Sequence, residues 1–461
     1  MKIGARHAVD LAHRAIHMVS QAIYMGAHAI RTAGQRARPA RTAVLFLLAA
    51  ILPVPGPSGV DSAAAQMLLV PMDRTQANHL KAYGLTYRIL EQGGRAEWLL
   101  NFQGGSFLLP DTESARRDAA LMGVTVQPAG PAEEARIRGI IAASNMESVV
   151  LEKATRVAIY TPPNSAPWDD AVTMALDYAE IPYDKIWDHD VLEGDLTEYE
   201  WLHLHHEDFT GQYSKFYITY AGAAWLEEEV ARNEEAARAL GHPNVPALKK
   251  AVSRAIRDYV EQGGFLFAMC SAPETLELAL AAHSVDIAAA YSDGTPPDPD
   301  AGSRMDWGLA MAFEDAELQI SPSVNAFSDI DGHQVNTPWG KQLGAFTLFD
   351  FSAKFDPVPA MLTQNHQSVL PDFYGLTTSF SIDRLKPGVV KLGVEGNWAK
   401  YIHGTLGEGT WTYYGGHDPE DPEHQIGDPH TDLELHPNSP GYRLILNNVL
   451  FPAARKKKLK T

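Results

Sequence analysis

Short apolar runs of strand length alternate with longer helical patterns through most of the chain. The helical patterns repeat apolar residues every three or four positions, and those at 223–241 and 245–264 end in Gly, as helix C-termini often do. The strand-like runs are residues 67–72, 96–101, 156–162, 183–188, 199–206 and 264–270. Strands that alternate with helices predict an α/β domain with a mainly parallel sheet and helices on both faces.

The pattern changes between about residues 283 and 385. This segment is rich in Pro, Asp and Asn and has little helical periodicity. We predict a loop-rich insertion that lies over the sheet rather than a second core. Further apolar runs and a last helix, at residues 439–454, complete the domain.

The first 65 residues have the composition of an export signal. The run "RTAVLFLLAAIL", residues 41–52, has a cationic start and an apolar core, and Ala63 and Ala65 supply the small residues of a signal cleavage site. We therefore predict cleavage before Gln66, an exported (periplasmic or secreted) protein, and a mature domain at 66–461 without a membrane span. An uncleaved anchor is the alternative. The lead before this run holds four histidines, and it is either a start placed too early or a metal-binding segment.

The charge of the chain limits its partners. With 57 acidic and 38 basic residues, the formal net charge is −19. An excess of negative charge argues against nucleic acid or an anionic membrane surface as the main partner. It suits a small ligand that is neutral or cationic.

Cys270 is the only cysteine of the chain. It ends an apolar strand and comes directly before a helical pattern with Pro273 in its first turn, while the small residues Ala268 and Ala272 flank it. This strand, nucleophile and helix order is typical of a nucleophile elbow. A helix N-terminus stabilises a thiolate, and the backbone amide of Ser271 can face a developing oxyanion. The alternative is an inert cysteine packed under the turn.

A nucleophilic thiol needs a base, and His417 is the candidate. It follows a late apolar strand and two glycines, in "TWTYYGGHDPE", and Asp418 and Glu420 lie near enough in sequence to orient its imidazole. A surface loop histidine is the alternative.

A second group of polar residues lies at the end of the run 199–206. The group is His203, His205, His206, Glu207 and Asp208. Strand alternation places the first two on one face and the third on the other. Imidazoles and carboxylates grouped in this way suit zinc or another divalent metal ion. A hydrogen-bonded pocket wall and simple structural filling are the alternatives. In the loop after the first strand, Asp73 and His79 are expected to border the same pocket mouth.

Several stretches carry a family resemblance. The elbow "FLFAMCSA" and the late "TWTYYGGHDPE" before a closing helix resemble the class I glutamine amidotransferase-like superfamily, and the closing stretch is similar to its ThuA-like branch. The stretches "LLVPMDRTQANHLKAYG", "EWLHLHHEDFTGQY" and "HPNSPGYRLILNNVLFPAA" resemble an exported bacterial group often labelled asparagine synthetase B, over nearly all of residues 66–461. The resemblance implies a flavodoxin-like fold, with Cys270 as nucleophile and His417 as its partner.

The chain also departs from these patterns. Lys2 stands where an asparagine synthetase has its nucleophilic Cys, and the ATP-binding Ser-Gly-Gly loop is missing, so ATP-dependent asparagine synthesis is not expected. The extra Asp in "HDPE" leaves either Asp418 or Glu420 as the third catalytic residue. Gly104 and Gly105 are candidates for the oxyanion loop, as is the loop after residue 208.

These observations predict an exported, cysteine-dependent amide hydrolase that resembles glutamine amidotransferases and acts on a small-molecule amide. The alternative is a non-catalytic or metal-dependent ThuA-like protein that binds sugars or cell-wall fragments. A cofactor is not required by either, although a divalent metal such as zinc fits the histidine group.

Overall fold

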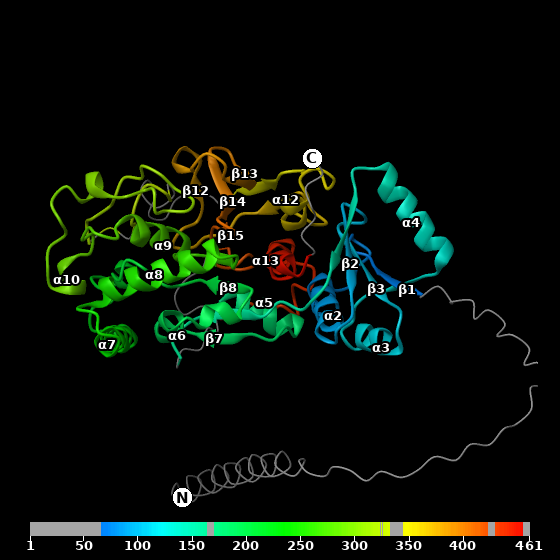
Figure 1. Cartoon of the computed structure of the whole chain (residues 1–461), viewed down its shortest axis with the longest axis horizontal. Coiled ribbons are helices and arrows are strands. Elements are labelled where there is room, and N and C mark those ends of the chain that lie inside the picture. Colours follow the sequence, from blue (N-terminus) through cyan, green and yellow to red (C-terminus); the bar gives the residue numbers. More distant parts are fainter. Residues whose placement is uncertain are drawn as a thin grey trace, which may run out of the picture. The chain divides into compact units, whose positions relative to one another are not determined.

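This computed structural model describes residues 66–163, 170–322, 324, 326–331, 344–422 and 429–454. They belong to one compact unit, Ser62–Thr461 (Figure 1). The predicted export region, residues 1–65, lies outside the described residues. Its cleavage therefore stays a prediction.

The described residues form two β-sheets. The smaller sheet has the order β4-β1-β3-β2-β5, and each neighbouring pair in it is antiparallel. Its strands are β1 (Met67–Val70), β2 (Ala96–Leu100), β3 (Ser106–Pro110), β4 (Gln127–Ala129) and β5 (Glu147–Leu151). The helices that follow these strands are α2 (His79–Glu91), α3 (Glu113–Leu121) and α4 (Pro131–Ala143).

The larger sheet joins a parallel half to an antiparallel half. Its order is β11-β10-β13-β14-β15-β9-β8-β6-β7, with β12 paired to β14. The parallel strands are β6 (Val157–Tyr160), β7 (Asp184–Ile186), β8 (Trp201–Leu204), β9 (Phe265–Met269) and β15 (Gly409–Tyr414). The antiparallel strands are β10 (Ala345–Leu348), β11 (Val369–Pro371), β12 (Phe380–Ser381), β13 (Val390–Glu395) and β14 (Trp398–Leu406).

The prediction of a mainly parallel, flavodoxin-like sheet is wrong. The runs 67–72 and 96–101 do not join the strands at 157–160 and 201–204, because they pair within a separate antiparallel sheet. An apolar run reports burial but not strand direction, which depends on the connection: a tight turn gives an antiparallel pair, and only a crossover gives a parallel one. The turn between β2 and β3, residues 101–105, is of the tight kind and uses positive φ angles at Gly104 and Gly105.

The segment 283–385 is also more than an insertion over the sheet. It supplies β10 and β11, which extend the larger sheet beyond β13, and β12, which pairs with β14. Phe346, Leu348 and Leu370 from these strands are buried in the main core. Alternation of buried and exposed residues over only three or four positions is a weak signal, and the many Pro and Asp residues around these strands obscure it.

Helices cover both faces of the parallel strands because consecutive side chains point to opposite sides. The remaining helices are α5 (Ala171–Ala179), α6 (Asp188–Glu193), α7 (Ala224–Ala239), α8 (Val245–Glu261), α9 (Ala272–Ala281), α10 (Ala290–Asp293), α12 (Pro357–Leu362) and α13 (Pro440–Leu450). In β9, Phe265, Phe267 and Met269 join a core with residues of α2, α5 and α13. Leu266 and Ala268 join a second core with residues of α8 and α9. The 3-10 turns are η1 (Asp195–Glu198), η2 (Tyr213–Lys215), η3 (Ala301–Arg304), η4 (Ile382–Arg384) and η5 (Phe451–Ala453).

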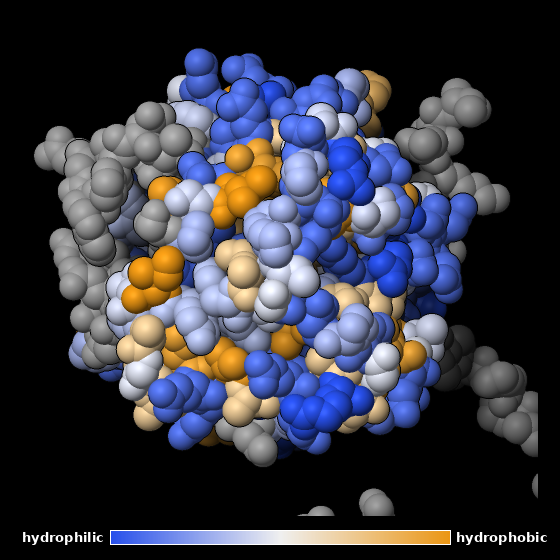
Figure 2. Space-filling model, turned by 90° about the vertical axis from the view of Figure 1, so that its left-hand side faces the viewer, coloured by the Kyte–Doolittle hydropathy of each residue, from blue (hydrophilic) through white to orange (hydrophobic). Residues whose placement is uncertain are grey.

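Among the described residues, no helix is both long and apolar enough to cross a membrane. The face shown in Figure 2 carries hydrophobic side chains in small groups separated by hydrophilic ones. Exposed apolar side chains scattered in this way are normal for a folded domain.

Candidate functional site

The backbone of Cys270 is strained. Its φ is 53°, in the left-handed region that non-Gly residues rarely adopt. The residue lies in the sharp turn between β9 and α9, and its side chain is buried. Its amide donates to the carbonyl of Gly416 at 3.1 Å, so the turn is fixed to the end of the neighbouring strand. Strain of this kind persists only where the surrounding structure enforces it, and it concentrates at functional sites.

His417 is brought to the same place by strand pairing. β15 runs parallel to β9, with Tyr414 opposite Met269, so the two carboxyl ends meet at one edge of the sheet. His417 is buried, and its amide donates to the carbonyl of Tyr374 at 2.7 Å. The structure therefore brings the two residues with predicted catalytic roles together.

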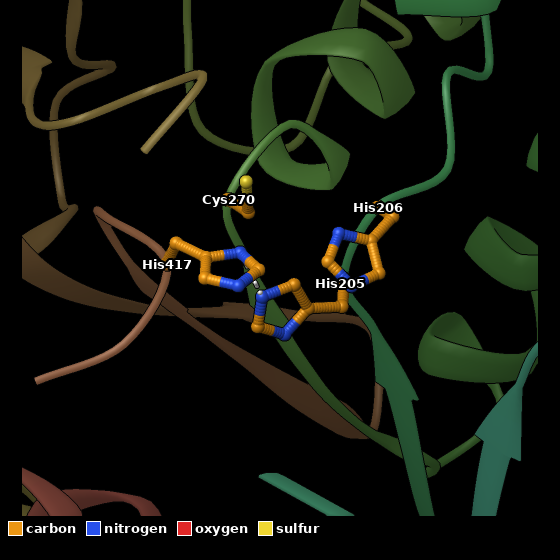
Figure 3. A group of neighbouring side chains, drawn as sticks. All are labelled: His205, His206, Cys270 and His417. Carbon is orange, nitrogen blue, oxygen red and sulfur yellow. Dashed lines mark hydrogen bonds between the residues drawn. The ribbon is translucent and has the colours of Figure 1, made fainter. Parts of the chain in front are cut away.

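The neighbouring parallel strand adds two imidazoles. β8 ends at Leu204, and His205 and His206 follow directly. Nε2 of His205 lies 3.0 Å from Nδ1 of His417. In Figure 3 the three imidazole rings lie close together, below the thiol of Cys270. One donor atom from each of these four residues lies within 4.8 Å of the donor atoms of the others.

Asp170 contacts the cluster through its carboxylate, at His205. It is the N-cap of α5, and its Oδ1 accepts from the amides of Val172 and Thr173 at 2.7 and 3.2 Å. Its carboxylate also lies 3.3 Å from Nδ1 of His205 and 3.2 Å from Nε2 of His203. Burial opposes ionisation of Asp170, but the two adjacent imidazoles hold its pKa well below the usual range.

These contacts select the tautomers of the cluster. Burial lowers the pKa of His205 to about 4, although Asp170 opposes the shift, so His205 is neutral near pH 7. A carboxylate only accepts hydrogen bonds, so Nδ1 of His205 carries the proton and donates to Asp170. Its Nε2 then accepts from Nδ1–H of His417. In this tautomer of a neutral His417, the lone pair is on Nε2.

Asp418 and Glu420, the predicted orienting residues, make other contacts. The carboxylate of Asp418 accepts from the hydroxyl of Thr431 at 2.7 Å and from the amide of Glu420 at 2.9 Å. The carboxylate of Glu420 lies 2.9 Å from Nδ1 of His436. The group at Nδ1 of His417 is therefore His205.

The predicted metal group is divided by the structure. His205 and His206 join the cluster, while His203 lies behind it, with Nδ1 donating to the carbonyl of Phe267 at 3.0 Å. The expectation that strand alternation sends His206 to the opposite face is wrong, because the strand ends before that residue. Asp208 instead organises its own loop: it accepts from the amides of Thr210, Gln212 and Ser214.

The predicted oxyanion and pocket-mouth residues of the N-terminal segment gather at a different place. The carbonyl of Gly104 accepts from the buried guanidinium of Arg443 at 2.7 Å. His79 stacks on His366, whose Nδ1 accepts from Arg443 at 3.0 Å. The carboxylate of Asp73 accepts from the amide of Thr75 within its own turn. The carbonyl of Gly105 accepts from the indole N–H of Trp98. These loops follow strands of the smaller sheet, and none of these residues lines the cavity beside the cluster that is described below.

Ser271 lies in the turn between Cys270 and α9, as its place in the sequence predicts. Its hydroxyl donates to the carbonyls of His205 and Glu207 at 3.4 Å, and the amide of Ala272 donates to the backbone carbonyl of His205 at 3.1 Å. These bonds fix the start of α9 to the loop after β8. The spacing between Cys270 and the two histidines is thereby set by the backbone.

A cavity of about 210 Å³ lies beside the cluster. Of the four clustered residues, His205 and His206 line it, and the other lining residues include Tyr160, Trp187, Glu207 and Lys249. Burial raises the pKa of Glu207 to about 7. Lys249 is held by a buried ion pair with Asp188 at 2.9 Å. The cavity therefore combines polar and charged groups with aromatic walls, which suits a small polar molecule.

Asp170 is a residue of the candidate site that the sequence did not reveal. The only available signal was its position: it precedes the helix that follows β6, and β6 pairs in parallel with β8. The N-terminus of that helix must lie near the carboxyl end of β8. Asp is a common N-cap residue, so the sequence alone does not indicate that Asp170 also contacts His205.

Comparisons with known proteins add no identification. No protein-family model matches the chain, and no curated protein matches it significantly. Among solved structures, two cytoplasmic proteins of Salmonella typhimurium share 9% and 11% identity, cover 66% and 65% of this chain and all of their own, and have TM-scores of 0.31 and 0.32. A β-galactosidase of Bacillus circulans shares 11% identity over 56% of this chain and 28% of its own, with a TM-score of 0.24. Likenesses this weak carry no conclusion on fold or function, and the resemblance to amidotransferases stays a prediction.

Proposed function

We propose that this protein is an exported, cysteine-dependent amide hydrolase of the glutamine amidotransferase-like kind. The observation that carries the proposal is the strained turn at Cys270, next to His417 and the His205–Asp170 pair behind it. Cys270 is the nucleophile and His417 is the general base and acid. His205 and Asp170 are positioning residues that hold the imidazole of His417 in one tautomer.

The reaction has two steps. His417 takes the thiol proton, and the thiolate of Cys270 attacks the amide carbon. When the tetrahedral intermediate collapses, the C–N bond breaks and the proton on His417 passes to the leaving amine, which gives a thioester. Water then gives one proton to His417 and attacks the thioester, which releases the acid and restores the thiol. The cavity beside His205 and His206 is the proposed substrate site.

A second candidate function is the binding of sugars or cell-wall fragments without catalysis. The specific observation in its favour is the cavity wall, where Tyr160 and Trp187 combine with polar groups. Aromatic faces beside hydrogen-bonding groups suit sugar rings as well as small amides.

The sole cysteine makes the test simple. Metal-free protein, kept in chelator, is incubated with a panel of small primary amides. Ammonia release is measured, and intact mass is recorded after acid quenching. We expect ammonia release and an acyl adduct in the wild type, and neither with Cys270→Ser. If native Cys270 resists iodoacetamide until the protein is denatured, and no amide gives an adduct, the hydrolase proposal fails and the binding function becomes the better account.

A further inference from the structure

The four donor atoms around the elbow form a set that a transition metal ion would recognise. Cys270, His205 and His417 are buried and His206 is partly buried, and the donor atoms lie within 4.8 Å of one another. In a tetrahedral zinc site, M–N distances of about 2.1 Å and M–S distances of about 2.3 Å place neighbouring donors roughly 3.3–3.8 Å apart. Small rotations of the side chains would bring this set to that geometry.

We propose that Cys270, His205, His206 and His417 bind one zinc-like divalent ion, and that this ion switches off the thiol. The ligand set differs from the group expected from sequence, because it includes the thiol and His417 and leaves out His203, Glu207 and Asp208. Both ring nitrogens of His203 are engaged, by Phe267 and Asp170. The carboxylate of Asp208 is held by its own loop.

The surroundings of His205 support the metal assignment. Imidazoles that bind metals usually donate their other N–H to a carboxylate. Nδ1 of His205 lies 3.3 Å from the carboxylate of Asp170, and its Nε2 faces His417. Asp170 is fixed in turn by the N-terminus of α5. The arrangement orients His205 toward the centre of the cluster before any ion binds.

The donor types select the metal. A thiolate and three imidazole nitrogens favour zinc, cobalt or copper over calcium and magnesium, which prefer oxygen ligands. Binding releases the thiol proton, so that Cys–SH and M²⁺ give Cys–S–M⁺ and H⁺. The charge of the ion is compensated by the thiolate and by the Asp170 carboxylate.

The regulatory part of this inference rests on the proposed function. A thiolate bound to metal cannot attack a carbonyl, and His417 cannot act as a base while its lone pair is on the ion. The metal-bound protein is therefore the inactive form. Export to a compartment whose free zinc varies would make activity depend on the metal supply.

Cobalt is the probe that tests binding without any substrate. Tag-free mature protein is stripped with chelator, transferred to metal-free buffer and titrated with Co²⁺. We expect saturation at one ion per chain, the strong visible absorption of tetrahedral cobalt, and a thiolate-to-cobalt charge-transfer band that Zn²⁺ abolishes. Cys270→Ser should lose the charge-transfer band, and His206→Gln should weaken binding at least ~10-fold. The exposed residue His283 provides the control, since His283→Gln should bind as the wild type does.

The outcomes are separable. Folded wild-type protein that binds no stoichiometric Co²⁺, or a charge-transfer band that survives in Cys270→Ser, overturns the metal site whatever the hydrolase assay gives. Circular dichroism on each variant, and the His206→Gln titration if Cys270→Ser does not fold, keep this test decisive. If Co²⁺ binds as expected but the metal-free protein forms no acyl adduct, the site stands and the regulatory part falls. If the adduct forms equally fast with zinc bound, the regulatory part is wrong while the hydrolase proposal holds.

Discussion

Gly375 packs directly against Gly416: a Cβ built on Gly375 would lie 2.7 Å from the Cα of Gly416 and 2.8 Å from the amide nitrogen of His417. Both neighbours are backbone atoms, so the clash can be relieved only by movement of the chain. Gly375 therefore has no room for a side chain, and its close contact holds the segment that carries His417 in place. The contact is reinforced where the amide of His417 donates to the carbonyl of Tyr374.

We predict that Gly375→Ala reduces amide hydrolysis strongly while the protein stays folded. The added methyl group displaces His417, and a displacement of about 1 Å at a catalytic group can cost ~10²-fold in rate. Gly139, in α4, has open space around its Cα, and Gly139→Ala is the matched control: it should keep activity and gain up to ~1 kcal/mol in stability. Initial rates and urea unfolding of both variants check the prediction. Equal activity of the two would show that this contact does not position the base.

A second prediction separates Asp170 from the residues that the sequence favoured. Asp170→Asn should lower the hydrolysis rate by ~10²-fold or more, because the neutral amide no longer fixes the tautomers of His205 and His417. Asn is also a good N-cap, so α5 should be kept. Asp418→Asn is the control, and it should change the rate far less, since that carboxylate is bonded to Thr431. A larger loss with Asp418→Asn would return the orienting role to the "HDPE" segment.

The sequence was sufficient for those parts of the site that depend on local order. The strand, cysteine and helix succession at 265–281 and the late histidine at 417 both lie where the pattern placed them. They meet because β9 and β15 are parallel neighbours, which is a tertiary relationship that the apolar runs did not contain. The role of Asp170 depends on a third neighbour, β8, and on a helix cap. No spacing along the chain indicates it.

Sheet direction could not be predicted for a similar reason. Burial of the runs at 67–72 and 96–101 was expected, and Leu69 and Leu99 are indeed in the core. The strand in the first run pairs with β3 and β4, and the strand in the second pairs with β3 and β5, rather than with strands of the larger sheet. Gly104 and Gly105 therefore lie in the β2–β3 turn of the smaller sheet, next to Arg443. Hydrophobic patterning sets which residues are inside. It leaves open which strands pair.

Glu274 gives a prediction on stability and pH. It lies in the first turn of α9, fully buried, and burial raises its pKa from 4.5 to about 8, although hydroxyl donors from Ser328 and Thr377 oppose the shift. Between these two values the folded protein holds one more proton than the unfolded chain. The stability that comes from keeping this proton on Glu274 is therefore present in full below pH 4.5. It is lost as the pH rises toward 8, by at most about 1.4 kcal/mol per pH unit.

We expect Glu274→Gln to remove that slope. The free energy of unfolding, measured by urea at several values between about pH 5 and pH 8, should fall less steeply in the variant than in the wild type. Glu228 is exposed on α7, and Glu228→Gln controls for the loss of one carboxylate; its profile should run parallel to that of the wild type. Parallel profiles for Glu274→Gln as well would mean that the buried carboxyl is ionised in the folded protein.

The export prediction depends on the sequence alone. The described structure begins at Gln66, whose carbonyl accepts from the amide of Asp111 at 2.9 Å. Expression of the full chain with its own leader should yield a periplasmic or secreted product that starts at or near Gln66, which intact mass and N-terminal peptide mapping can establish. A product that keeps residues 1–65 in the cytoplasm would contradict both cleavage and export.

The last prediction concerns the buried ion pair of Lys400 and Asp372, which supports the loop beside His417. The ammonium of Lys400 lies 2.6 Å from Asp372 Oδ1 and donates to the carbonyls of Phe373 and Thr378 at 2.5 and 2.9 Å. Burial lowers the pKa of Lys400, and Asp372 opposes that shift. Lys400→Met should cost roughly 3–5 kcal/mol, because it leaves a buried carboxylate without its counter-ion. Lys400→Met combined with Asp372→Asn should be more stable than the sum of the single losses predicts, by ~1 kcal/mol or more, because the double variant has no unpaired charge. Urea unfolding of the two single variants and the double variant completes the cycle. Additive losses would show that the pair is not coupled, and that the backbone bonds of Lys400 alone hold the loop.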